Sequence, residues 1–159
     1  MRAAVVTVSS SRAGGSGDDV SGSALAEHCE RAGLEVTREL VPDDREAIAA
    51  TLTRLADGDD VRFVFTTGGT GLTPDDVTPE ATRAVIDRDA PGLAEAMRAE
   101  SLRHTPMAML SRGVAGIADQ TLIVNFPGSP KAIDENFAVI APALRHAVDL
   151  LHGDGRRHH

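Results

Sequence analysis

The sequence contains neither tryptophan nor tyrosine, and only four of its 159 residues are phenylalanine. Single-stranded nucleic acids bind proteins largely by stacking their bases on aromatic side chains, so this mode of binding has little support here. The formal net charge of −8 also argues against a duplex partner, because nucleic-acid-binding proteins usually carry a basic surface. We therefore expect no nucleic-acid partner.

Cysteine and long apolar runs are also scarce. Cys29 is the only cysteine, which excludes an internal disulfide, and its place in an apolar helical pattern predicts a buried, unreactive thiol. Residues 1–8 lack the pattern of a secretory signal, and no apolar run approaches the ~18 residues needed to span a membrane. We expect a cytoplasmic protein without a membrane partner.

The remaining composition is that of one soluble domain. Apolar residues make up 42% and charged residues 25% of the chain, and the length allows a single core built mainly from Val, Ile, Leu, Ala and Met. We assign residues 1–153 to this domain. Residues 154–159 are expected to form a disordered tail, in which His158-His159 are either native or a cloning remnant.

Predicted strands alternate with predicted helices along the chain. Apolar or alternating runs predict strands at 3–8, 34–40, 61–65 and 121–126, with 34–40 at an edge of the sheet. Periodic patterns and capping residues predict helices at 23–32, from Asp43 to Gly58, from Thr78 onward, around Leu93 and Met97, and from Pro130 onward. The alternation predicts a single-domain α/β fold, a three-layer α/β/α arrangement with a mostly parallel, Rossmann-like sheet.

Two of the predicted helices carry clear apolar stripes. The helix after Asp43 places Ile48, Leu52, Leu55 and Ala56 on one face. The final helix does the same with Ile133, Phe137, Ile140, Leu144, Val148 and Leu151. Pro142 removes a backbone hydrogen bond there, so we expect a kink or a short break. Residues 9–22 are rich in Ser, Gly and Asp, which is typical of a mobile loop.

The loops that leave the carboxyl ends of parallel strands are where such sheets bind ligands. Four predicted loops qualify: residues 9 onward, 42–43, 67–77 and 125–130. In the third, the segment Thr66-Thr67-Gly68-Gly69-Thr70-Gly71 offers backbone N–H groups and hydroxyls that suit phosphate oxygens or a polar ring edge. A tight turn with glycines at positive φ explains the glycines equally well, and the threonines favour binding.

Two aspartates follow predicted strands at the same edge. Asp76 lies outside the helix that Thr78 is expected to cap, so it is a candidate functional group. Asp43 follows the edge strand but also fits an N-cap with Glu46 as its capping-box partner, and the residues alone favour the cap. Two like charges ~4 Å apart repel by about 4 kcal/mol at an effective dielectric near 20, so carboxylates beside phosphates imply a cation such as Mg²⁺.

A second turn at this edge, Pro127-Gly128-Ser129-Pro130, leads into the final helix, with Lys131 in its first turn. Cations usually avoid a helix N-terminus, so an anionic ligand is one explanation of Lys131 and a solvated surface lysine is the other. Other chemistries find no support. The chain lacks a Walker lysine, a third glycine at the dinucleotide spacing, a Gly-x-Ser-x-Gly elbow and a histidine pair at metal-ligand spacing.

Taken together, these segments resemble the molybdenum-cofactor biosynthesis family of molybdopterin-binding and molybdopterin-adenylating proteins. The resemblance covers nearly the whole chain. It is carried by Val41-Pro42-Asp43, the segment 66–71, Asp76-Val77-Thr78-Pro79-Glu80-Ala81-Thr82, Pro91-Gly92-Leu93, Leu110-Ser111-Arg112 and Pro127-Gly128-Ser129-Pro130.

The resemblance implies transfer of adenylate from ATP to the terminal phosphate of molybdopterin, with Mg²⁺ and release of pyrophosphate, in a homotrimer or hexamer. It implies that Asp43 and Asp76 are catalytic and hold the metal, which reverses the preference for Asp43 as a cap. Ser111 matches a serine linked to pterin handling. The substrate-binding residues that we expect are Ser9, Thr67, Gly68, Gly69, Thr70, Gly71, Ser111, Pro127, Gly128, Ser129 and Pro130.

Two other functions stay open from the sequence. The chain could be a non-catalytic oligomer that stores or presents molybdopterin, as suggested by members of the family that resemble this chain and do not adenylate. It could also be an unrelated regulatory domain for an acidic metabolite, which needs only the phosphate loop and the parallel sheet. Retention of both Asp43 and Asp76 favours the enzyme over these alternatives.

Overall fold

The computed structural model describes residues 1–10 and 19–153 of the chain. Within these residues, the strands are β1 (Arg2–Val8), β2 (Glu35–Val41), β3 (Val61–Thr67), β4 (Arg88–Asp89), β5 (Ala115–Ala118) and β6 (Thr121–Phe126). The helices are α2 (Val20–Arg31), α3 (Arg45–Asp57), α4 (Thr78–Val85), α5 (Pro91–Leu102), the 3-10 helix η1 (Pro106–Leu110) and α6 (Pro130–Leu151). None of these described helices is long and apolar enough to cross a membrane.

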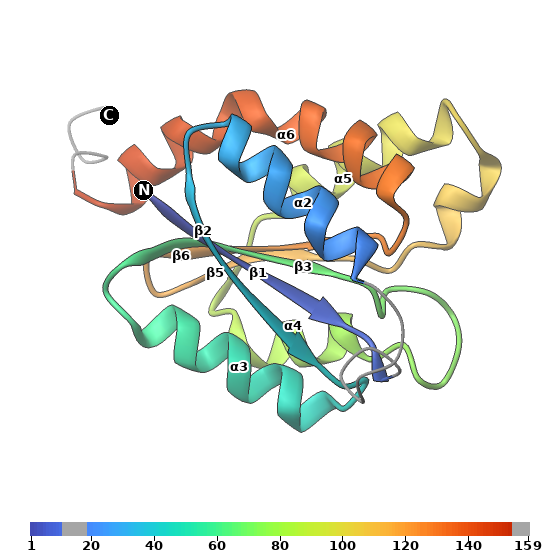
Figure 1. The fold of residues 1–159 in the computed structure, drawn as a ribbon, viewed down its shortest axis with the longest axis horizontal. Coiled ribbons are helices and arrows are strands. Elements are labelled where there is room, and N and C mark those ends of the chain that lie inside the picture. The colour runs from blue at the N-terminus through green and yellow to red at the C-terminus, as the bar shows by residue number, and fades with distance from the viewer. Residues whose placement is uncertain (11–18, 154–159) are drawn as a thin grey trace.

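The strands form one sheet in the order β2-β1-β3-β6-β5-β4. The first four are mutually parallel, whereas β5 runs antiparallel to β6 and β4 antiparallel to β5. Helices α2, α5 and α6 cover one face of the sheet, and α3 and α4 cover the other (Figure 1). The predicted three-layer α/β/α fold with a mostly parallel sheet is confirmed, and β2 lies at an edge, as predicted.

Each face of the sheet has its own apolar core. Val5 packs into the core under α2, α5 and α6, while its neighbour Val6 packs into the core under α3 and α4. Because successive side chains of a strand point to opposite faces, a strand covered on both sides reads as an uninterrupted apolar run. The predicted buried face of α3 is confirmed, since its buried residues are Ile48, Leu52, Leu55 and Ala56.

The thiol of Cys29 lies in the first of these cores and is fully buried. Burial, with a smaller contribution from the negative charge of Glu30, raises the pKa of Cys29 to about 12. A thiol with so high a pKa carries almost no thiolate at neutral pH, and the thiolate is the reactive form. The predicted burial of Cys29 is therefore confirmed, and the raised pKa is what an unreactive thiol requires.

Two helices begin at other residues than the sequence predicted. Helix α2 starts at Val20 rather than Ser23, because the carboxylate of Asp19 caps it by accepting from Gly22 N at 3.0 Å. Residues 20–22 are therefore helical and not part of a loop, whereas 11–18 lie outside the described residues. Helix α3 is capped by Asp44, whose Oδ2 accepts from Ala47 N at 2.8 Å. The N-cap that the residues alone favoured at Asp43 is therefore one residue further along the chain, which agrees with the reversal of that preference.

Helix α6 confirms the predicted apolar stripe, and the short break that was one of the two expectations at Pro142 does not occur. It buries Ile133, Phe137, Ile140, Leu144 and Val148, as predicted. It continues from Pro130 to Leu151 without a break at Pro142, which lies on the exposed side of the helix. A proline on the solvent side leaves its unpaired carbonyl partner accessible to water, so the helix tolerates it there. The short antiparallel strands β4 and β5 were not predicted.

The carboxyl ends of the parallel strands lie along one edge of the sheet. Their registers pair Val8 with Val41, Thr7 with Thr67, and Thr67 with Phe126. From β1 the strand order continues in one direction to β2, whereas from β3 it continues in the opposite direction to β6. The reversal between β1 and β3 is the switch point at which open α/β sheets bind ligands, and the glycine segment leaves β3 there.

Candidate active site

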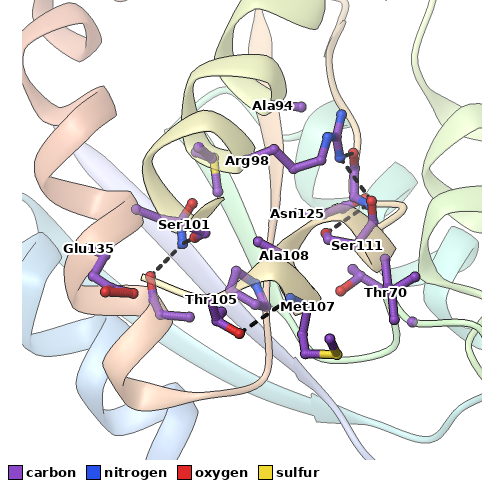
Figure 2. Close-up of a pocket in the computed structure, with 17 residues that line it drawn as sticks. Thr70, Ala94, Arg98, Ser101, Thr105, Met107, Ala108, Ser111, Asn125 and Glu135 are labelled. Carbon is purple, nitrogen blue, oxygen red and sulfur yellow. Dashed lines mark hydrogen bonds between the residues drawn. The ribbon is translucent and has the colours of Figure 1, made fainter. Parts of the chain in front are cut away.

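A cavity of about 280 Å³ opens at this edge of the sheet, which is near the lower limit of the ~300–1,000 Å³ common for small-molecule sites. The loop after β3, helix α5, the 3-10 helix η1 and the first turns of α6 enclose it (Figure 2). Of the predicted binding residues, Thr70, Gly71, Ser111 and Pro127 line this cavity. The structure thus brings segments from distant parts of the chain to one site.

The glycine segment makes a turn that requires glycine. Gly68 and Gly69 have φ of 96° and 74°, in the left-handed region that other residues avoid. A Cβ on Gly68 would lie 2.6 Å from Val8 O, and one on Gly69 would overlap Thr78 Oγ1. In the described chain, no residue accepts a hydrogen bond from the backbone N–H of Gly69, Thr70 or Gly71. The segment is therefore a constrained turn that also leaves three amide donors available to a ligand.

Hydroxyl groups beside this turn are used by the protein itself. Thr66 and Thr67 belong to β3 rather than to the loop, and both are buried. Thr67 Oγ1 donates to Pro127 O at 2.7 Å, which joins the glycine segment to the turn before α6. The prediction that Thr78 caps α4 is wrong, because Val77 holds the N-cap position. Thr78 Oγ1 instead donates to Gly68 O at 3.0 Å. Because the Thr78 hydroxyl is bonded to the Gly68 carbonyl, it stabilises the glycine turn and does not cap the helix.

Asn125, near the end of β6, connects β3, α4 and the segment before β5 through its side chain. Its Nδ2 donates to Thr66 Oγ1 and Thr82 Oγ1, each at 3.0 Å, and its Oδ1 accepts from Val114 N at 3.1 Å. The side chain is 4% exposed, so these bonds satisfy polar groups that water cannot reach. A buried network with all members bonded fixes the positions of the strands that carry it.

Arg112 fixes the outer part of the loop, a role that the sequence did not indicate. Its Nε donates to Gly71 O and its Nη2 to Asp76 O, both at 2.7 Å, and its backbone N donates to Thr70 O. Its Nη1 lies 2.6 Å from Glu80 Oε2 on helix α4. The guanidinium group therefore holds residues 70–76 in one conformation, using the fork of donors that only arginine has.

The pairing of Arg112 with Glu80 predicts a pH-dependent contribution to stability. The hydrogen bond from Arg112 lowers the pKa of Glu80, and burial opposes this effect less strongly. A carboxyl group whose pKa is lower in the folded state stabilises the fold above its unfolded pKa of about 4.3, and this stabilisation is lost as the pH falls through the folded pKa.

We therefore expect Glu80→Gln to lower the thermal unfolding midpoint modestly at pH 7, with a difference from wild type that shrinks as the pH falls below 4 (about the unfolded pKa). Thermal melts of both proteins across this range measure it. Glu95→Gln, on the exposed side of α5, is the matched control. It should change neither the thermal unfolding midpoint at pH 7 nor its dependence on pH. A difference that stays constant with pH would contradict the ion pair as its cause.

The two predicted catalytic aspartates lie on either side of the end of β1. Asp43 Oδ2 accepts from the backbone N of Ser10 at 3.1 Å and from its Oγ at 3.2 Å. Asp76 Oδ2 accepts from the backbone N of Thr73 at 3.0 Å and from its Oγ1 at 2.8 Å. Among the described residues, none donates to Oδ1 of either aspartate. As far as residues 1–10 and 19–153 are concerned, both carboxylates are thus oriented through one oxygen.

Asp76 is the closer of the two to the glycine segment. A Cβ on Gly71 would lie 2.9 Å from Asp76 Oδ2. Asp43 follows β2, which is separated from β3 by β1. No group of three or more His, Cys, Asp or Glu side chains that could hold a metal occurs within residues 1–10 and 19–153. Mg²⁺ is commonly held by one or two carboxylates together with substrate phosphates, so a pair of aspartates fits that ion.

The other predicted binding residues are arranged around the same edge. Gly128 packs against the glycine segment, since a Cβ there would lie 3.6 Å from Gly68 Cα, and its carbonyl accepts from Ser21 Oγ. Ser129 caps α6, with Oγ accepting from Ala132 N. The backbone N of Ser9 donates to Val41 O at 2.9 Å. Ser111 lines the cavity, and its carbonyl accepts from Arg98 Nη1 at 3.2 Å.

Arg98 and Glu135 are cavity residues that the sequence did not single out. Arg98 comes from α5 and donates through Nη1 to the carbonyls of Ser111 and Gly113. Glu135 comes from α6 and, in Figure 2, lies on the side of the cavity away from Thr70. Both occur in helices in which charged residues alternate with apolar ones, and a charged residue in such a helix ordinarily faces water. No local signal distinguishes them from their exposed neighbours.

Comparison with known proteins places these features in a family context. Residues 4–146 match the protein family described as a probable molybdopterin binding domain. A protein of Helicobacter pylori strain J99 named molybdopterin adenylyltransferase is 44% identical over 121 residues, which are 76% of this chain and 69% of that protein. The molybdenum cofactor synthesis protein cinnamon of Drosophila melanogaster is 45% identical over 123 residues. That match spans 77% of this chain but only 20% of the Drosophila protein.

The fold is shared with solved structures of similar proteins. The crystal structure of the molybdopterin biosynthesis enzyme MoaB from Thermus thermophilus superposes with a TM-score of 0.87 at 46% sequence identity. The superposition covers 94% of this chain and 95% of the Thermus chain. At this identity and coverage, the two chains have one architecture in common over nearly their full lengths.

Proposed function

This chain belongs to the family of molybdopterin-binding domains, and from that membership we propose that it is a molybdopterin adenylyltransferase in molybdenum cofactor biosynthesis. The substrates are molybdopterin and ATP, and the working form is a homo-oligomer, a trimer or a hexamer. The observation that carries the proposal is the glycine turn at the switch point. It presents three amide donors, which have no acceptor in the described chain, beside the carboxylate of Asp76.

The reaction needs positioning more than covalent chemistry. An oxygen of the terminal phosphate of molybdopterin attacks the α-phosphorus of ATP and forms a new P–O bond. The bond between that phosphorus and the bridging oxygen to the β-phosphate breaks, and pyrophosphate leaves. A phosphate monoester loses its second proton with a pKa of about 6, so at neutral pH the nucleophile needs no general base. The protein must hold two polyanions in line.

The residues of the glycine turn orient the phosphates. Backbone N–H groups of Gly69, Thr70 and Gly71 point at no acceptor of the described chain and can donate to phosphate oxygens. Thr67, Thr78 and Arg112 hold this segment rigid, so the donors need no rearrangement when the ligand binds. Preformed donors stabilise developing charge more than mobile ones do.

Asp43 and Asp76 are the residues that would hold Mg²⁺. When bound there with ATP, the ion neutralises phosphate charge and favours departure of pyrophosphate. The carboxylates themselves are kept in place by Ser10 and Thr73, whose backbone N–H and hydroxyl groups both donate to the other carboxylate oxygen. Two hydrogen bonds to one oxygen fix the direction in which the second oxygen points.

The test is release of pyrophosphate from ATP by the purified protein in the presence of molybdopterin and Mg²⁺. We expect release to require all three components and to produce adenylated molybdopterin in equal amount. A wild-type protein that binds molybdopterin tightly but releases no pyrophosphate would be a carrier rather than an enzyme. A protein that binds no molybdopterin would overturn the proposal altogether.

The neighbours Asp43 and Asp44 offer a matched pair for testing the metal ligand. Asp44→Asn keeps the cap of α3, because asparagine is as good an N-cap as aspartate, and should leave turnover unchanged. Asp43→Asn keeps the acceptor for Ser10 but loses the charge, and we expect pyrophosphate release to fall by a factor of about 100. Equal rates for Asp43→Asn and wild type would show that this carboxylate does not act in the reaction.

A further inference from the structure

The segment of residues 111–113 connects the cavity wall to the glycine segment. It lies between η1 and β5 and belongs to neither. Ser111 lines the cavity, and the backbone N of Arg112 donates to Thr70 O at 2.8 Å. Because the segment lacks the regular hydrogen bonds of a helix or a strand, its conformation depends on the groups that bind its backbone.

Arg98, on helix α5, binds the two outer carbonyls of this segment (Figure 2). Its Nη1 donates to Ser111 O at 3.2 Å and to Gly113 O at 3.0 Å. In the described residues, no other group donates to either carbonyl, and no carboxylate pairs with Arg98. One guanidinium nitrogen therefore fixes the backbone on both sides of Arg112.

Arg112 extends this contact to the loop that carries Asp76. Its Nε donates to Gly71 O and its Nη2 to Asp76 O, both at 2.7 Å, while its Nη1 pairs with Glu80. Glu80 holds the guanidinium of Arg112, whereas Arg98 holds its backbone. The two arginines thus form a continuous series of hydrogen bonds from helix α5 to the glycine segment and Asp76.

We propose that Arg98 is a positioning residue for the adenylyl transfer, acting through Arg112 on the glycine segment and on Asp76. A misplacement of about 1 Å can slow a reaction about 100-fold, so a residue that fixes this backbone controls the rate without touching a substrate. Arginine suits the role because its planar guanidinium is rigid and always charged. The inference rests on the proposed function, since it concerns the rate of that reaction.

The first test measures amide hydrogen exchange in the ligand-free protein. Arg98→Met removes the guanidinium and keeps an unbranched side chain at the cavity wall. We expect exchange to be faster by a factor of about three or more at three hydrogen-bonded amides of the loop, those of Thr73, Asp76 and Thr78. The amides of strand β1 should exchange as in the wild type. Unchanged exchange in the loop would overturn the proposal, and so would an equal acceleration in β1, which would indicate a general loss of stability.

The second test measures the kinetics of pyrophosphate release. Arg98→Met is expected to lower kcat about 10- to 100-fold, with the KM for molybdopterin changed less than about twofold. A raised KM at unchanged kcat would overturn the positioning role, because it would indicate a direct contact with the pterin. The double variant Arg98→Met/Arg112→Met should be no slower than Arg112→Met alone, since Arg98 acts through Arg112. Losses that multiply in the double variant would contradict this order of action.

Arg103 provides the matched control. It follows helix α5 directly, its side chain is 75% exposed and pairs with Glu100, and it does not line the cavity. Arg103→Met makes the same chemical change, and both loop exchange and turnover should equal those of the wild type. An equal loss in both variants would overturn the proposal, because the charge near α5 rather than the bonds of Arg98 would then control the rate.

These outcomes separate the inference from the function on which it rests. A wild type that releases no pyrophosphate with molybdopterin counts against the proposed function, whatever the exchange of the ligand-free protein shows. An active wild type, combined with an Arg98→Met variant that keeps wild-type exchange and kcat, leaves the enzyme intact and removes the role of Arg98.

Discussion

Asp76→Asn is expected to reduce the rate of pyrophosphate release by a factor of about 100 to 1,000, the range found when one preorganised electrostatic group is removed from an active site. Asparagine can still accept from Thr73 N and Oγ1, so the loop keeps its conformation. The substitution removes the negative charge beside Gly71 and with it the proposed magnesium ligand. Steady-state kinetics with varied Mg²⁺ should show that kcat falls more than KM rises.

Asp75 is the matched control for this prediction, because it is the adjacent residue and its side chain is exposed. Asp75→Asn makes the same chemical change one position away, and turnover should remain that of the wild type. If Asp76→Asn retains wild-type turnover, the carboxylate has no catalytic role. If both variants lose activity equally, net charge of the loop rather than the position of Asp76 controls the rate.

The layers of the fold could be predicted from the sequence because their signals are local. The apolar residues of α6 repeat every three to four positions, which identifies a helix with one buried face. The run from Ala3 to Val8 is apolar almost throughout, which identifies a strand covered on both faces. The order of parallel strands then places four loops at one edge. Strand β5 escaped prediction because its four residues, Ala115–Ala118, carry neither alternation nor β-branched enrichment beyond Ile117.

The side-chain contacts within the site could not be predicted, since they join residues far apart in the chain. Arg112 contacts Gly71, 41 residues away, and Asn125 contacts Thr66, 59 residues away. The segment Leu110-Ser111-Arg112 contributes to the family resemblance, but its residues do not indicate which distant groups Arg112 contacts. The cap of α3 shows the same limit at short range: Asp43 and Asp44 are equivalent as candidates, and only the position of Ser10 in the fold separates them.

The glycine segment illustrates how a structural and a functional interpretation can both hold. A turn explains why Gly68 and Gly69 cannot carry a side chain, because their φ values are positive and their Cβ positions are occupied. The turn also places the following amides where no acceptor of the described residues binds them. Under the proposed function, the conformation that requires glycine also leaves these N–H donors for a phosphate, so a substitution should affect stability and ligand binding together.

Gly69→Ala is expected to lower the free energy of unfolding by about 2–3 kcal/mol, of which about 1–2 come from placing an L-residue in the left-handed region and about 1 from the lost hydrogen bond of Thr78. The new methyl group would overlap Thr78 Oγ1 and displace it from Gly68 O. Chemical denaturation measures the stability, and the same samples should release pyrophosphate at least tenfold more slowly (about the loss expected from a small misplacement of reacting groups) because the amides are displaced.

Gly58→Ala provides the control, since it makes the same change in a loop at the opposite edge of the sheet. Gly58 has a φ of −74°, which alanine adopts readily, and a Cβ there would make only an ordinary contact, 3.5 Å from Asp60 Oδ1. Stability and turnover should both match the wild type. A Gly69→Ala variant that loses stability but keeps full activity would mean that the turn is purely structural, because the phosphates would then be held by groups other than its amides.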